Sequence, residues 1–92
     1  MLSPGPGTRV YLAVGATDMR KSIDGLAALV AASLALDPLS THWFVFCNRA
    51  RDKLKILYWD HNGFCFYYRR LERGRFAWPM SAPGEALCIT PR

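Results

Sequence analysis

Aromatic residues are concentrated in one stretch of this 92-residue chain, from Trp43 to Pro79. That stretch holds eleven of the twelve aromatic side chains, arranged in short alternating runs that are separated by turn residues. Aromatic side chains favour the pleated, half-buried surface of a β-sheet, and an alternation of period two is typical of a strand. The stretch therefore predicts a sheet at the centre of the fold.

Three strands are predicted within the aromatic stretch. Residues 43–47 are apolar at every position, as expected of a central strand. In residues 53–59 we expect a clean inner face, formed by Leu54, Ile56 and Tyr58. The outer face is mixed and carries Lys53, Lys55, Leu57 and Trp59. The third strand, 64–70, follows Asp60-His61-Asn62-Gly63, in which Asn-Gly tolerates the positive φ angles of a tight hairpin.

One amphipathic helix is predicted before the aromatic stretch. Ser22 is its candidate N-cap, with Thr17 or Asp18 as alternatives for an earlier start. An apolar stripe follows at helical spacing, formed by Ile23, Leu26, Ala27, Val30 and Leu34. Asp37-Pro38 should end the helix, because a residue before proline is disfavoured in the helical conformation. Short strands at 9–14 and 85–89 complete the predicted elements.

These elements predict an α+β fold. We expect a single small domain over residues 9–89, with a mostly antiparallel sheet of four to five strands and one amphipathic helix packed on one face. Residues 1–8, with two prolines and two glycines, should be a flexible N-terminal arm. Thr90-Pro91 is typical of a helix start, so 90–92 are expected to begin a truncated C-terminal helix.

One helix can cover only one face of the predicted sheet. The second face must then be exposed, paired with another copy of the chain, or covered by the expected C-terminal helix. We expect it to carry side chains from among Trp59, Tyr67, Lys53, Lys55 and Arg69.

The net charge of +5 is concentrated as well. Residues 49–75 carry eight basic and three acidic side chains, and the rest of the chain is balanced. In an antiparallel meander, the loop at 48–52 and the segment at 69–75 meet at one end of the sheet. The cations expected there are Arg49, Arg51, Lys53, Arg69, Arg70, Arg73 and Arg75. Such a group suits phosphates, with strongly salt-dependent binding; the alternative is a solvated end whose charge prevents aggregation.

Three further basic residues are candidates for contact with nucleic acid. Lys55 follows Lys53 on the same predicted strand. Arg20 and Lys21 precede the helix, whose N-terminal amides can join them in holding an anion. The alternative is that basic residues before a helix are simply solvated. Exposed aromatic side chains can stack on bases, and the best candidates for exposure are Trp59 and Tyr67.

No catalytic or metal-binding pattern is present in the sequence. The carboxylates form no recognisable pair, the histidines and cysteines lack the spacing of zinc ligands, and no glycine-rich phosphate loop occurs. We therefore expect no enzyme activity, no cofactor and no metal. The chain shows no secretory signal and no membrane segment, and its three widely spaced cysteines predict no disulfide framework. These features predict a cytoplasmic protein.

Three motifs together resemble a known family. They read TDMRKSIDGLAALV, WFVFCNRARDKLKILYWDHNGF and RRLERGRFAWP, within a match that runs from Arg9 to Pro79. In this order and spacing they resemble the small accessory protein of the insertion-sequence-sixty-six class of bacterial transposable elements, of the Orf2-like or TnpB accessory type. The resemblance implies a role in transposition beside a separate transposase, and it supplies no catalytic residues.

Two functional hypotheses follow from the residues and the resemblance. The first is a non-catalytic accessory factor that binds DNA at the ends of the element through the basic residues named above. The second is a protein-interaction module that docks on the transposase or on another copy of itself, without direct DNA contact. Its expected contact residues are Trp59, Tyr67 and Trp78.

Overall fold

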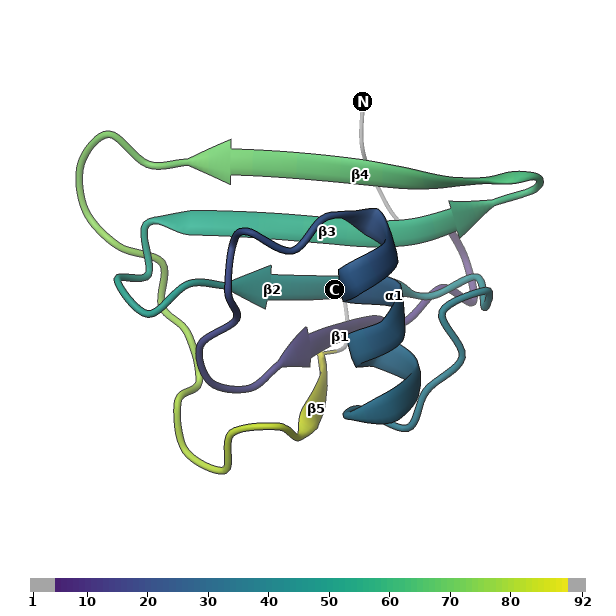
Figure 1. Cartoon of the computed structure of the whole chain (residues 1–92), viewed down its shortest axis with the longest axis horizontal. Coiled ribbons are helices and arrows are strands. Elements are labelled where there is room, and N and C mark those ends of the chain that lie inside the picture. Colours follow the sequence, from purple (N-terminus) through teal and green to yellow (C-terminus); the bar gives the residue numbers. More distant parts are fainter. Residues whose placement is uncertain (1–4, 90–92) are drawn as a thin grey trace.

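Five strands form one sheet in the order β4-β3-β2-β1-β5, with a single helix against it (Figure 1). The structure, a computed structural model, describes residues 5–89. The elements are β1 (Val10–Ala13), α1 (Ile23–Ala32), β2 (Trp43–Cys47), β3 (Lys53–Asp60), β4 (Gly63–Arg70) and β5 (Ala86–Ile89). The predicted α+β fold with a mostly antiparallel sheet is confirmed. The residues 1–4 of the expected arm and the expected C-terminal helix at 90–92 lie outside the described residues.

The connections follow from the lengths of the intervening segments. Strands β2, β3 and β4 form the predicted antiparallel meander, joined by short loops. Strand β1 is parallel to β2, and α1 lies in the long crossover that a parallel pair requires. Strand β5 returns to pair antiparallel with β1. The sheet therefore has β4 at one edge and β5 at the other.

The core lies between α1 and one face of the sheet. Leu26 and Val30 of the helix are fully buried, and they pack with Phe44, Phe46 and Leu57, which are fully buried too. Burial of a large apolar side chain stabilises a fold by roughly 1.5–3 kcal/mol relative to exposure. Figure 1 shows α1 crossing in front of β1, β2 and β3, with β4 beyond the helix. The helix therefore covers only part of its face of the sheet.

The expectation about the faces of β3 was wrong. Phe44 is in register with Leu57, and Leu57 with Phe66, so these three side chains share the face that α1 covers. Leu54, Ile56 and Tyr58 lie on the opposite face, which has no helix on it within residues 5–89. The helix packs where two phenylalanines of β2 meet a leucine of β3. That packing decides the phase of β3, which is the choice of the residues that face the core.

This phase also divides the five candidates for the second face between the two faces of the sheet. Tyr67 and Arg69 do lie on the helix-free face, since they are in register with Ile56 and Leu54. Trp59, Lys53 and Lys55 lie on the helix side instead, because they alternate with Leu54 and Ile56 along the strand.

Helix α1 starts where predicted but ends earlier. Ser22 is the N-cap residue, although its side chain makes no capping hydrogen bond. The predicted end at Asp37-Pro38 was wrong, since the helix ends at Ala32. Ala35 adopts a left-handed φ of 55°, and the Leu36 N–H then donates to the Val30 carbonyl over 3.1 Å. Glycine is the residue usually found at a left-handed position that follows a helix.

The β3–β4 hairpin is confirmed, but its positive φ angle falls one residue before the predicted Asn-Gly pair. The loop residues are His61 and Asn62, because Asp60 is in register with Gly63. The positive φ of 54° falls on His61 and not on the Asn-Gly pair. Histidine is among the non-glycine residues enriched in this region, so the turn forms without a glycine at that position.

An irregular segment, 71–85, connects the two edges of the sheet. It runs along the end of the sheet at which β2 ends (Figure 1). The Gly15 N–H donates to the Pro79 carbonyl over 2.9 Å, and the Gly84 N–H donates to the Val14 carbonyl over 3.2 Å. Only glycine allows this approach at position 15. A Cβ there would lie 2.7 Å from the Pro83 Cβ, which is too close. The segment is thus fixed to the end of β1.

We expect Ala35→Gly to stabilise the fold by about 0.5–1 kcal/mol, because glycine adopts the left-handed conformation without the Cβ penalty. Urea unfolding followed by circular dichroism measures the change. The matched control is Ala28→Gly at an exposed position of α1, which should cost up to about 1 kcal/mol. Equal destabilisation by the two substitutions would contradict this account of the helix end.

Candidate nucleic-acid interface

The loop between β2 and β3 presents two arginines at one end of the sheet. Asn48 holds this loop: its Oδ1 accepts the N–H groups of Asp52 and Lys53, both over 3.0 Å, and its Nδ2 donates to the Asp52 carboxylate over 2.7 Å. Arg51 has a positive φ of 61° within the loop. Because one side chain satisfies three polar groups, the loop keeps a defined shape while Arg49 and Arg51 remain at its surface.

The chain after β4 is tied to the same loop. The Leu71 N–H donates to the Asp52 carbonyl and the Phe76 N–H to the Arg51 carbonyl, both over 2.7 Å. Arg70 is in register with Lys53. The meander thus brings the two basic segments to one end of the sheet, as the sequence predicts. We call this group the basic end; it consists of Arg49, Arg51, Lys53, Arg69, Arg70, Arg73 and Arg75.

Only one member of the basic end has an acidic partner among the described residues. The Arg70 guanidinium pairs with Glu72 at 3.0 Å, and this hydrogen bond raises the pKa of Arg70. The other six cations form no ion pair within residues 5–89. They surround the sheet end, since Arg69 is on the helix-free face and Lys53 is on the helix side. This end can accept phosphates from more than one direction.

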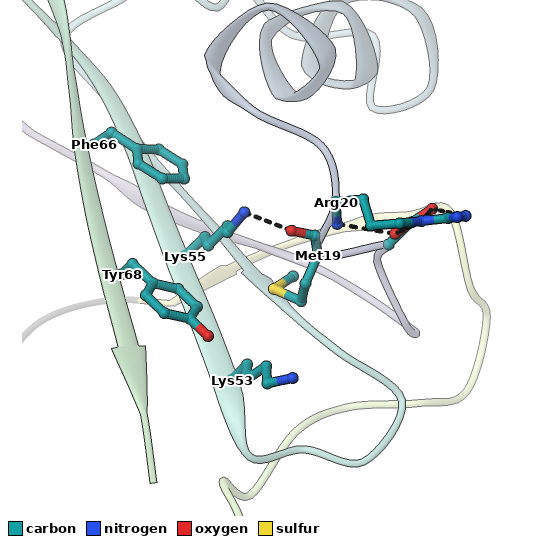
Figure 2. A pocket seen from close by; sticks show the side chains of 7 residues that line it. Met19, Arg20, Lys53, Lys55, Phe66 and Tyr68 are labelled. Atoms are coloured by element: carbon teal, nitrogen blue, oxygen red, sulfur yellow. Dashed lines mark hydrogen bonds and ion pairs between the residues drawn. The ribbon is translucent and has the colours of Figure 1, made fainter.

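A groove of about 500 Å³ opens beside the basic end, between the connector before α1 and strands β3 and β4. We call it the aromatic groove; its lining residues are Asp18, Met19, Arg20, Lys53, Lys55, Phe66 and Tyr68. Figure 2 shows the two rings of β4 on one side and the connector on the other. Lys53 belongs to both the groove and the basic end, so the two sites are continuous.

Lys55 fastens the connector to the sheet. Its Nζ donates to the carbonyls of Met19 over 2.6 Å and Lys21 over 2.9 Å, as Figure 2 shows for Met19. The ammonium lies 5.1 Å from the ring centroid of Phe66 and 5.6 Å from that of Tyr68, within range of cation–π attraction. The structure therefore gives Lys55 an internal role, which its prediction as a nucleic-acid contact did not include.

Asp18 and Arg20 form a clamp at the rim of the groove. The Arg20 side chain donates to the Asp18 carboxylate with Nε at 3.0 Å and Nη2 at 2.8 Å, and the Arg20 backbone N–H donates over 2.9 Å. These bonds lower the pKa of Asp18 to about 2. Asp18 thus forms a local turn and does not cap α1. Lys21 follows as an exposed residue outside the groove lining.

The three predicted partner-binding aromatics lie in different places. Trp59 is half-buried on the helix side, with its ring 5.1 Å from that of Phe64. Tyr67 is exposed on the helix-free face. Trp78 is half-buried, and its indole N–H donates to the carbonyls of Ala13 over 3.1 Å and Gly15 over 3.2 Å. The structure does not bring them together, and Trp78 fixes the 71–85 segment to β1.

The sequence prediction missed Phe66 and Tyr68 as functional candidates. Their alternation along 64–70 was visible, but the connector that faces them is about 45 residues earlier in the chain. The available signal was the pair of lysines on the neighbouring strand, since Lys55 is in register with Tyr68.

The described residues offer little for catalysis or metal binding. Within residues 5–89, no three histidine, cysteine, aspartate or glutamate side chains gather where a metal ion can bind. Burial raises the pKa of the Cys47 thiol, which disfavours the nucleophilic thiolate. In the same part of the chain, α1 is too short to cross a bilayer.

Comparisons with known proteins give one family and two relatives of similar sequence. The family described as IS66 Orf2 like protein matches residues 8–92. Two proteins of Sinorhizobium fredii (strain NBRC 101917 / NGR234) are similar over 99% of this chain. The uncharacterized protein y4hO is 45% identical, and 78% of its length is covered. The uncharacterized protein y4jC is 36% identical, and 77% of its length is covered. No solved structure matches the chain significantly.

Lys55→Met should destabilise the fold by about 1–3 kcal/mol. The methionine side chain has a similar length but cannot make the two hydrogen bonds of the ammonium. Lys53→Met is the matched control, since the Lys53 ammonium makes no hydrogen bond within residues 5–89. That substitution should change the free energy of unfolding by less than about 0.5 kcal/mol. Urea unfolding of both variants measures the difference, and equal effects would argue against the internal role of Lys55.

Arg20→Ala should raise the pKa of Asp18 from about 2 toward its ordinary value, because the side-chain hydrogen bond is the largest cause of the shift. Since the folded-state pKa is depressed, the pair stabilises the fold above about pH 4, and this contribution disappears as the pH falls toward about 2. A carboxyl ¹³C NMR titration of Asp18 measures the pKa. Lys21→Ala is the control, with a much smaller expected change; an unchanged pKa in Arg20→Ala would refute the clamp.

Proposed function

This chain belongs to the family of IS66 Orf2-like proteins, which associates it with transposition, and we propose that it is a non-catalytic accessory factor that binds DNA. The proposed contact surface is the basic end of the sheet, and the proposed target is the ends of the element. The observation that carries the proposal is the gathering of seven cations there, six of them without an ion pair within residues 5–89.

The charge distribution supports a polyanionic ligand. Lys53 and Arg70 are directly opposite on neighbouring strands, and like charges in that position destabilise a sheet. Glu72 offsets this repulsion at Arg70 alone. Phosphates would relieve the remaining repulsion, and each phosphate contact releases counterions from the DNA. Such contacts position a protein on DNA without reading its sequence.

The location of the cations supports contact with an intact duplex. They project from a loop, from two strands and from the segment after β4, and backbone hydrogen bonds tie these parts together. Because these parts are already ordered, binding to a phosphate backbone does not require the basic end to become ordered first. An accessory factor that binds the element's DNA works in the cytoplasm beside the transposase, which supplies the catalysis.

A second candidate function is docking on the transposase, or self-association, through the helix-free face. The observation that favours it is the apolar character of that face, with Trp43 stacked on Tyr58 at 4.9 Å and Tyr67 exposed on the same face. Exposed aromatic surface is enriched at protein interfaces. This face and the basic end overlap at Arg69, which belongs to the basic end and lies on the helix-free face.

The proposal predicts steeply salt-dependent binding that the basic end controls. A fluorescent duplex with the terminal sequence of the element is titrated with protein at several salt concentrations. Log affinity should fall linearly with log salt, and the slope of Arg73→Ala/Arg75→Ala should be smaller in magnitude by about 0.9 for each phosphate that the variant no longer neutralises. Both arginines are exposed, so the fold should persist.

Arg9→Ala is the control for loss of a positive charge outside the basic end. Arg9 is exposed beside the start of β2, at the opposite end of the sheet, so its removal should leave the slope unchanged. Identical slopes for the wild type and both variants would remove the basic end as the contact surface. A folded wild type that binds no duplex at low salt would leave docking on the transposase as the function.

A further inference from the structure

We propose that the aromatic groove binds an unpaired DNA strand, with bases against Phe66 and Tyr68 and phosphates on the lysine and arginine side chains of the rim. This inference rests on the proposed function, since it assumes that the protein works on DNA. It adds a second kind of nucleic-acid contact, to single-stranded DNA, at a site beside the protein surface that is proposed to bind the duplex.

The two rings are available to a ligand. Phe66 is 38% exposed and Tyr68 is 48% exposed, although both are on the face that α1 covers elsewhere. They stay exposed because α1 stops short of β4 (Figure 1). Residues two apart on a strand are about 6.6 Å apart on the same face, so both rings line the same side of the groove, with the Lys55 ammonium within 5.6 Å of each ring centroid (Figure 2).

Cations surround this aromatic surface. The groove lining contains Arg20, Lys53 and Lys55 against a single carboxylate, that of Asp18, which already pairs with Arg20 at 2.8 Å. An ammonium has three N–H donors, and Lys55 uses two of them on backbone carbonyls. One donor remains beside the rings, at a charge held in a fixed position. Aromatic rings beside fixed cations are the combination with which proteins bind single strands.

Unpaired bases fit this surface better than a duplex does. In a duplex the bases stack on each other and expose only their edges in the grooves, so their faces are not accessible to Phe66 and Tyr68. An unpaired base can stack on a ring, and this contact tolerates any sequence. A basic protein segment fits the groove less well, because the lining carries a net positive charge and no free carboxylate among the described residues.

Lys53 connects the groove to the basic end. Its side chain lines the groove, and its strand position faces Arg70 of the basic end. A DNA molecule that lies on the basic end as a duplex can therefore continue into the groove as a single strand. The arrangement matches a junction between paired and unpaired DNA.

The test compares the two faces of β4. A fluorescein-labelled oligo-dT of about 15 nucleotides, within the site sizes of single-strand binders, and a blunt-ended duplex are titrated by anisotropy at low salt. The proteins are the wild type, Phe66→Ala, Tyr68→Ala and Tyr67→Ala. Tyr67 is the matched control, on the same strand with a similar exposure but on the opposite face. Each groove substitution should weaken oligo-dT binding at least about fivefold, because a ring on which a base stacks is removed.

The other measurements separate stacking from its alternatives. Tyr67→Ala should keep oligo-dT affinity within about twofold, and Tyr68→Phe should retain it because the ring on which a base stacks is kept. Duplex affinity should be the same in all variants, and thermal melting checks that each is folded. Equal losses of affinity in Tyr67→Ala and Tyr68→Ala, or no loss in either groove variant, would overturn the proposal.

The outcome also distinguishes this inference from the proposed function. A wild type that binds the duplex but not oligo-dT overturns the groove proposal and leaves the basic end as a DNA site. A wild type that binds neither overturns both. If the element's transposase binds the wild type and Tyr67→Ala but not Phe66→Ala or Tyr68→Ala, and oligo-dT does not bind, the groove is a protein-docking site and the proposal is wrong.

Discussion

The packing of α1 on Phe44, Phe46 and Leu57 is the interaction on which the rest of the structure depends. It decides which face of the sheet is the core, and through the strand register it fixes the face of every residue in β3 and β4. Because the helix has only ten residues, it covers the central strands and leaves β4 beyond its reach. The exposed rings of the aromatic groove are therefore a direct result of how short the helix is.

The basic residues fall into two groups. Lys55 is on the covered face at the margin of the helix, so its ammonium needs acceptors, and the connector supplies two carbonyls. Arg20 is held by Asp18 and Arg70 by Glu72. The remaining cations of the basic end make no ion pair within residues 5–89. The family relationship associates the chain with transposition, and these side chains give the proposed DNA contact its physical basis.

Much of the fold could be predicted from local patterns, because hairpins and helix starts depend on neighbouring residues. The meander, the β3–β4 hairpin and the Ser22 cap position were of this kind. The phase of β3 was not, since the face with the two lysines also carries Leu57 and Trp59, and only the register with β2 shows that this face is the core side. The helix end was also missed, because alanine at position 35 gives no sign of a left-handed conformation. The candidate site divides in the same way: the basic end required only the order of three consecutive strands, whereas the aromatic groove required a contact between the connector at 18–20 and strands β3 and β4, which no local pattern encodes.

The pairing of β1 with β5 has a consequence for how the protein is made. Val10 is in register with Ile89, so two strands from opposite ends of the described chain are neighbours in the finished sheet. Contacts between such distant residues are slow to form, because the entropy cost of closing a long loop comes before the contacts can stabilise the fold. During synthesis, one edge of β1 has no partner until the residues of β5 have left the ribosome. Folding of this sheet is therefore completed after translation of its last strand, and the nascent chain carries an open edge until then.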